Sequence, residues 1–187
     1  MDQSGLKTVA NPSELFVSKK QNTEPGSAIA VTLDGDRSIM IEIQALVSSA
    51  VYGTPQRISN GFNSKRLNML LAILEKKAGF KIGVKDVFIN ITGGIKIEDT
   101  AIDLAVVSAI LSSNINVSVT SGTCFCAEID LSGELRSVSN IDKRISEAER
   151  LGYKKIIVSN NSKIGYTPKL IQTVKLKNLS QVCLLYT

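Results

Sequence analysis

Residues 99–112 read DTAIDLAVVSAILS, and this stretch decides the fold. Apolar residues occupy nearly every side of the helix that it would form, whereas a surface helix keeps a broad polar face. Asp99 is of the residue types that cap a helix N-terminus by accepting hydrogen bonds from backbone N–H groups. We therefore predict a fully buried helix, capped by Asp99, at the centre of the core.

Segments on both sides of this helix alternate as β-strands do. In residues 39–47 the odd positions are all apolar, and Glu42 and Gln44 take the other face. The pattern predicts a half-buried strand, paired with residues 28–33 across a turn at residues 34–36. Further strands are expected at residues 86–92, 123–129 and 155–159.

Two amphipathic helices are also predicted. Leucines recur at helical spacing within residues 63–78, and Gly79 follows as a C-terminal stop. The wetter face of this helix carries Lys65, Asn68, Ala72 and Lys76. Residues 140–151 form the second helix, capped by Asn140, and a short terminal helix is expected near residues 178–185. Strands interleaved with helices predict a mixed α/β (α+β) domain rather than a bundle or a sandwich.

Length and composition limit the class of protein. A chain of 187 residues, 43% of them apolar, is long enough to bury the core of one domain. No apolar run approaches the roughly 20 residues that span a bilayer, and the N-terminus lacks a signal-peptide pattern. We expect a soluble, cytoplasmic protein with no membrane partner.

Residue usage also excludes some chemistry. The chain has no histidine, and its cysteines, Cys124, Cys126 and Cys183, form no CxxC pair, so a structural zinc or other metal site is not expected. Without histidine, catalysis would lack the usual general base near neutral pH. Lys plus Arg (22) exceed Asp plus Glu (17), and the pI of about 9.1 is compatible with a polyanionic partner.

A set of motifs, in order along the chain, resembles the RadA (Sms) family of bacterial recombination proteins. The motifs are NPSELF at 11–16, EIQALV at 42–47, RLNMLLAILEK at 66–76, DLAV at 103–106 and GELR at 133–136. The resemblance covers essentially the whole chain. It implies a Lon-protease-like domain at residues 26–187, preceded at residues 1–25 by a linker where the family's ATPase domain ends.

Three parts of the full-length family pattern are absent from this sequence. They are the four-cysteine zinc element, the Gly-rich nucleotide loop ending in Gly-Lys-Ser/Thr, and a Lys-Asn-Arg-Phe-Gly segment. The resemblance therefore implies that ATP, Mg²⁺ and zinc belong to the part of the protein outside this chain. We expect no cofactor here and, for this fragment, no enzyme activity of its own.

The Lon-like fold implies a further test, because true Lon proteases use a Ser–Lys dyad. The Lon serine stretch corresponds to residues 99–103, which puts Ala101 at the nucleophile position, and the lysine position is Asp142. Lys143 is turned by about 100° on the helix and is a poor substitute. Asp103 and Asp142 resemble a catalytic carboxylate pair, but each also falls in a first helical turn, where the macrodipole favours an acid.

The family resemblance implies a binding role for the domain. RadA proteins resemble hexameric ring helicases that promote branch migration beside a RecA-type recombinase, and duplex or branched DNA is the expected partner. Phosphate contacts need cations. The alternative for each candidate Lys or Arg is that it is an ordinary solvated surface charge. Two other functions stay open: a cryptic Ser/Thr peptidase using Thr100, and a purely structural module for ring assembly. The candidate DNA-binding residues are Arg57, Lys65, Arg66, Arg136, Lys143 and Arg144.

Overall fold

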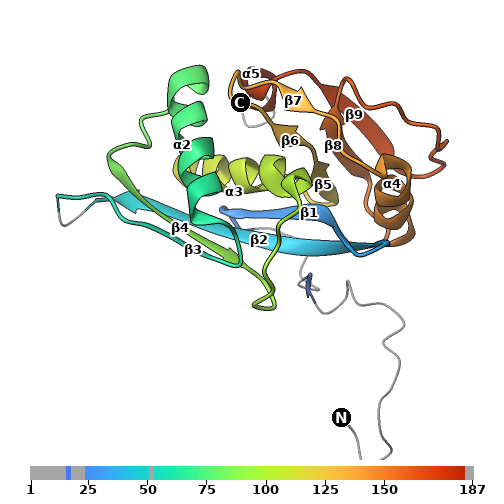
Figure 1. Cartoon of the computed structure of the whole chain (residues 1–187), viewed down its shortest axis with the longest axis horizontal. Coiled ribbons are helices and arrows are strands. Elements are labelled where there is room, and N and C mark those ends of the chain that lie inside the picture. The colour runs from blue at the N-terminus through green and yellow to red at the C-terminus, as the bar shows by residue number, and fades with distance from the viewer. Residues whose placement is uncertain (1–15, 18–23, 51–52, 184–187) are drawn as a thin grey trace, which may run out of the picture.

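The computed structural model describes residues 16–17, 24–50 and 53–183. A seven-stranded mixed sheet runs through it in the order β3-β4-β2-β1-β5-β8-β9 (Figure 1). β1 (Ser27–Asp34) and β2 (Arg37–Ser49) form an antiparallel hairpin, and β2 also pairs antiparallel with β4 (Lys85–Ile91). The other neighbours pair in parallel: β3 (Arg57–Asn60), β5 (Thr123–Cys126), β8 (Lys155–Ser159) and β9 (Gln172–Leu176).

Helices lie on both faces of this sheet (Figure 1). β1 shows the division, because Ala28 and Ala30 belong to one apolar cluster and Ile29 and Val31 to the other. The first cluster includes side chains of α2 (Ser64–Ala78), α3 (Asp103–Ile115) and α5 (Leu179–Cys183). The second includes those of α4 (Ile141–Arg150). The mixed α/β class predicted from the sequence is confirmed.

The buried central helix is also confirmed. Every residue of α3 from Asp103 to Ser112 is buried. A short 3-10 turn, η1 (Thr100–Ile102), precedes it, and the Asp99 carboxylate accepts a hydrogen bond from the Ala101 N–H at 3.1 Å. The helix ends at Asn116, whose φ of 56° is left-handed.

The single strand predicted at residues 123–129 is wrong at Ala127. There the chain leaves the main sheet because Ala127 bonds to the start of the central helix. Its N–H donates to the Ala101 carbonyl at 3.0 Å, and its carbonyl accepts from the Leu104 N–H at 3.2 Å. Beyond it, β6 (Glu128–Ile129) pairs with β7 (Leu135–Arg136) in a separate two-stranded sheet.

Other differences from the sequence-based expectations are local. The strands β3, β7 and β9 were not predicted, because they are short and β3 and β9 lie at the sheet edges, where no strict alternation is required. Asn140 has a left-handed φ of 53° and makes no side-chain cap on α4, contrary to its predicted role. The predicted linker at residues 1–25 and the last residues of the predicted terminal helix lie largely outside the described residues.

Among the residues that the structure describes, no helix is both long enough and apolar enough to cross a bilayer.

The turn after β3 provides a stability test. Gly61 has a φ of 80°, and a Cβ there would lie 2.5 Å from the Ile95 carbonyl oxygen and 2.7 Å from the Ile91 Cβ. Gly61→Ala should therefore combine backbone strain of about 1–2 kcal/mol with an overpacking cost of about 1–3 kcal/mol. Gly152→Ala is the matched control, since Gly152 has a φ of 82° but open space around it. Urea unfolding checks this, and equal losses of stability in the two variants would contradict it.

Candidate functional site

The Asp99 carboxylate connects three elements just before the buried helix. Its Oδ2 accepts hydrogen bonds from the Thr32 hydroxyl at 3.0 Å and the Leu33 N–H at 3.1 Å, both in β1. The same oxygen receives the Arg144 Nη1 of α4 at 2.7 Å. Burial acts to raise the pKa of Asp99, but the bonds and charge of Arg144, with those from Ala101 and Thr32, outweigh it and lower that pKa.

Arg144 itself lies inside the protein, with a side chain only 1% exposed. Besides Asp99, its guanidinium donates to the Val31 carbonyl and to the Ser139 carbonyl, each at 2.9 Å. A buried cation with paired donors has no access to a phosphate. The prediction that Arg144 binds DNA is therefore wrong, and the physical reason is its ion pair with Asp99.

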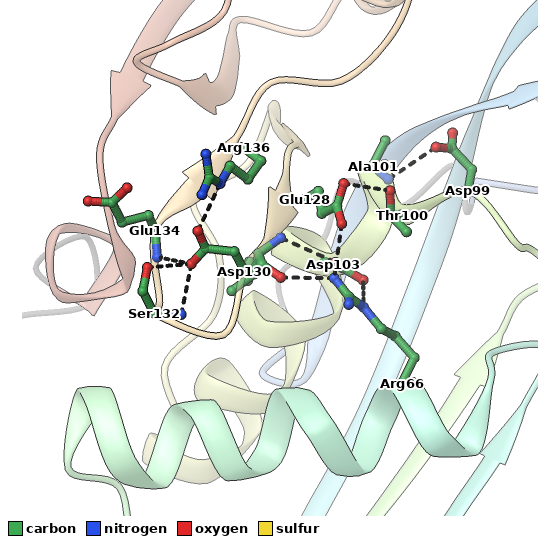
Figure 2. A network of polar contacts seen from close by, with 11 residues as sticks. Arg66, Asp99, Thr100, Ala101, Asp103, Glu128, Asp130, Ser132, Glu134 and Arg136 are labelled. Carbon is green, nitrogen blue, oxygen red and sulfur yellow. Dashed lines mark hydrogen bonds and ion pairs between the residues drawn. The ribbon is translucent and has the colours of Figure 1, made fainter.

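A second ion pair, between Arg66 and Asp103, holds the first turn of α3 (Figure 2). Arg66 at the start of α2 forms a two-pronged contact with the Asp103 carboxylate and also donates to the Ile129 carbonyl at 2.9 Å. The Ile129 N–H in turn donates to Asp103 at 3.2 Å. The hydrogen bond to Asp103 raises the pKa of Arg66, while burial raises the pKa of the Asp103 carboxyl.

The Arg66 side chain is 20% exposed and lies 3.7 Å from the Glu128 carboxylate in addition. Two carboxylates and a carbonyl thus surround its guanidinium. The prediction that Arg66 binds DNA is therefore also corrected, because a phosphate would have to displace these acidic partners. Asp103 proves to be the partner of an arginine as well as a first-turn acid.

The dyad positions do not form a catalytic pair. Ala101 is completely buried, and its N–H and carbonyl are used by Asp99 and Ala127. The Asp142 carboxylate accepts hydrogen bonds from the Gly165 N–H at 3.0 Å and the Tyr166 N–H at 3.1 Å, so it anchors the loop between β8 and β9. The two positions therefore lack the hydroxyl and the amine of a Ser–Lys dyad.

Thr100 is exposed, and its hydroxyl donates to the Glu128 carboxylate at 3.1 Å (Figure 2). The hydrogen-bond partner of the Thr100 hydroxyl is therefore a carboxylate and not a lysine amine. A Ser/Thr–Lys arrangement is not formed at this residue.

Two of the candidate DNA-binding residues lie together on one exposed surface. Arg57 in β3 reaches α2, where its Nη1 is 3.4 Å from the Asn68 Oδ1. Lys65 lies one helical turn before Asn68, and Lys76 lies farther along the same exposed stripe. We call Arg57, Lys65, Asn68 and Lys76 the α2 surface. The predicted wet face of this helix is confirmed.

The remaining two candidates lie elsewhere. Arg136 is 57% exposed and donates to the Asp130 carboxylate at 2.8 Å (Figure 2). Hydrogen bonds from Ser132, Glu134 and Arg136, the Ser132 hydroxyl foremost, lower the pKa of Asp130 to about 2. Lys143, 3.5 Å from Asp36, is on α4, at the opposite end of the molecule from α2 (Figure 1). The six predicted residues thus do not form one patch.

The cysteines are free thiols in the described part of the chain. Cys124 and Cys126 are buried on one face of β5, and burial raises the pKa of both thiols, that of Cys126 to about 12. Both therefore stay protonated at neutral pH and serve as small apolar side chains.

Comparison with known proteins gives the family. Residues 39–162, more than half of the chain, match the family model described as subunit ChlI of Mg-chelatase. The chain belongs to this family. Curated relatives of this chain carry the name DNA repair protein RadA. They include proteins of Bacillus subtilis (37% identical over 97% of this chain), Helicobacter pylori strain 26695 (46% over 84%) and Streptococcus pneumoniae (39% over 97%).

These relatives confirm the resemblance to the RadA family that the motifs predicted. This chain spans 40% of the length of the Bacillus subtilis relative, 35% of the Helicobacter pylori relative and 44% of the Streptococcus pneumoniae relative. More than half of each relative therefore has no counterpart in this chain.

The family match contradicts two predictions. We expected this fragment to be no enzyme, but the matched model is named for a subunit of an enzyme, Mg-chelatase. We also expected no cofactor in it, whereas a Mg-chelatase subunit model in RadA relatives points to ATP and Mg²⁺ binding in this region. Both expectations are wrong. They were drawn from missing motifs, and a missing motif says nothing about the enzyme to which a chain belongs.

The described side chains do not by themselves fit a magnesium–nucleotide site. Among them, no group of three or more His, Cys, Asp or Glu residues could hold a metal ion. The sequence also contains no Gly-Lys-Ser/Thr at the end of a Gly-rich loop, the element whose backbone N–H groups cradle phosphates.

The Asp99–Arg144 pair yields a prediction about stability. Arg144→Ala removes the cation that pairs with the half-buried Asp99 carboxylate and one donor to each of two carbonyls, and should destabilise the fold by about 3–5 kcal/mol. Lys143→Ala, the neighbouring control, removes the same charge from a side chain that is 55% exposed, and should cost less than about 0.5 kcal/mol. Denaturant unfolding of both variants measures the difference, and similar costs would show that Arg144 is not structural.

Proposed function

We propose that this chain is a DNA-contacting domain of a RadA-type protein that acts in DNA repair and recombination. The relatives that support this carry the printed name DNA repair protein RadA. A formal net charge of +5 suits a polyanionic partner. The proposal concerns what this domain contributes to the activity of a longer protein.

The observation that carries the proposal is the α2 surface. Arg57 contacts Asn68, and Lys65 lies one helical turn before Asn68 on the same exposed stripe. Neither cation has an acidic partner in any described contact. Each phosphate neutralised by such a cation releases a condensed counterion, which is the main source of affinity for DNA. Arg136 and Lys143 are kept as additional contacts, each weakened by its neighbouring aspartate.

We further propose a Lon-protease-like fold for residues 26–187, with residues 1–25 as the connection to the rest of the protein. The buried helix that follows Asp99 supports this reading. In a hexameric ring, such a domain would hold duplex or branched DNA during ATP-driven branch migration beside a RecA-type recombinase in the cytoplasm. A purely structural ring-assembly module is the second candidate.

DNA titration separates these two functions. Arg57→Ala combined with Lys65→Ala should weaken binding of labelled duplex DNA and lower the slope of log K against log salt by about 2, because about one counterion is released per lost phosphate contact. The control is Lys163→Ala combined with Lys169→Ala, which removes the same charge from exposed residues between β8 and β9. Equal losses in the two double variants would rule out the α2 surface, and no binding by the unmodified chain would favour the structural module.

The peptidase alternative has a separate test. Incubation with unfolded casein should release no peptides, because Thr100 is bonded to an acid and Ala101 carries no nucleophile. Thr100→Ala should leave the result unchanged. Cleavage by the unmodified chain that disappears in Thr100→Ala would establish a threonine peptidase instead.

A further inference from the structure

Two cavities open beside the first turn of α4, at the end of the molecule away from α2 (Figure 1). Their volumes are about 400 Å³ and about 430 Å³, which is the size of small-molecule sites. Asp142 and Lys143 line both cavities, so the two adjoin, and we call them together the α4 groove. The first cavity extends to Asn161 and Lys163 after β8, and the second extends to Ser38 below the β1–β2 turn.

The first cavity offers hydrogen-bond donors and positive charge. Asn140 provides no side-chain cap, so the first N–H groups of α4 keep the positive end of the helix dipole without a side-chain acceptor. Lys143 lies 3.5 Å from Asp36, whose side chain is 98% exposed, and Lys163 is exposed on the opposite wall. The carboxylate of this cavity, Asp142, already accepts two backbone N–H groups of the loop between β8 and β9. This combination suits a phosphate group.

Two buried hydroxyl groups give an independent sign of a ligand. Ser38 is 8% exposed, and its Oγ has no hydrogen-bond partner within the described part of the chain. Its side chain points to the α4 side of the sheet, because Met40, two residues along β2, belongs to the apolar cluster of α4. Ser162 is 3% exposed, equally without a partner among the described residues, and follows Asn161 of the first cavity. A buried hydroxyl that bonds to nothing in its own chain costs stability, so a partner from outside explains it.

The second cavity suits the hydroxyl groups of a sugar. Its walls combine the carboxylates of Asp36 and Glu147 with the hydroxyls of Ser38 and Ser146 and the half-buried ring of Tyr166. Sugar hydroxyls both donate and accept hydrogen bonds, so they match walls that mix carboxylates with hydroxyls. A second phosphate would instead be repelled by the carboxylates. The two cavities together therefore fit one molecule that has a phosphate at one end and free hydroxyls at the other.

DNA does not have this chemistry. Within a DNA strand the sugar lacks the hydroxyl that distinguishes RNA, and phosphodiester bonds occupy its remaining hydroxyl oxygens. A DNA sugar would therefore leave the carboxylates and hydroxyls of the second cavity without hydrogen-bond donors.

We propose that the α4 groove binds a small sugar phosphate. Its phosphate lies at the first turn of α4 between Lys143 and Lys163, and its hydroxyls lie in the second cavity beside Ser38. The proposal goes beyond the proposed function, because it concerns a small molecule and a site far from the α2 surface.

The test is a titration of the isotope-labelled chain, followed by NMR through its backbone N–H signals. Ribose phosphate should shift the signals of residues 141–144 and bind at least about tenfold more tightly than inorganic phosphate, because its hydroxyls add hydrogen bonds. Ribose without phosphate should shift no signals.

Two substitutions separate the two ends of the ligand. Lys163→Ala should weaken both ribose phosphate and inorganic phosphate by about tenfold, because a charged donor is lost. Ser38→Ala should weaken ribose phosphate by about fivefold and leave inorganic phosphate unchanged, because one neutral hydrogen bond is lost. Urea unfolding should show that Ser38→Ala is at least as stable as the unmodified chain, since the hydroxyl has no partner in the described fold.

Lys154→Ala is the matched control, because Lys154 is an exposed lysine that does not line the α4 groove. It should bind ribose phosphate as the unmodified chain does. Equal binding of ribose phosphate and inorganic phosphate, no shift at residues 141–144, or an equal loss in Lys154→Ala would each overturn the proposal. So would displacement of ribose phosphate by duplex DNA, since the groove would then belong to the nucleic acid. Failure of the α2 surface to bind DNA would leave these results unchanged.

Discussion

The ion pair between Asp99 and Arg144 is the constraint on which the arrangement of this chain depends. It joins the end of β1, the start of the buried helix and the outer helix α4 at one carboxylate. Burying a charge is costly unless it is paired and hydrogen-bonded, so each of these contacts requires the others. The pair therefore fixes how α4 lies against the sheet, a matter that apolar packing alone leaves open.

The Arg66–Asp103 ion pair likewise fixes how neighbouring segments lie, in this case α2 and β6 against the first turn of α3. Together with the bonds between Ala127 and the residues of η1 and α3, it draws the chain after β5 out of the main sheet and into the small sheet of β6 and β7. Two of the four candidate DNA-binding arginines, Arg66 and Arg144, thus hold the fold together. Planar guanidinium groups suit both phosphates and buried carboxylates, so residue type alone does not distinguish these roles.

The fold gives the two faces of the sheet different surfaces. The α2 surface presents cations held by an amide and suits a polyanion. The other face of β2, β3 and β4 presents amides and the exposed apolar side chains of Leu46 and Ile58.

The sequence by itself determined what repeats locally. The apolar helix after Asp99, the leucine stripe of α2, the β1–β2 hairpin and the family motifs are all patterns within about 15 residues, and burial follows such periodicity. Only the tertiary structure decided which charges meet. Asp99 and Arg144 are 45 positions apart, and Arg66 and Asp103 are 37. No local pattern reports such pairs, because the free energy of a charge depends on what the folded chain brings beside it. For the same reason, the loss of predicted DNA contacts at Arg66 and Arg144 became visible only in the folded protein.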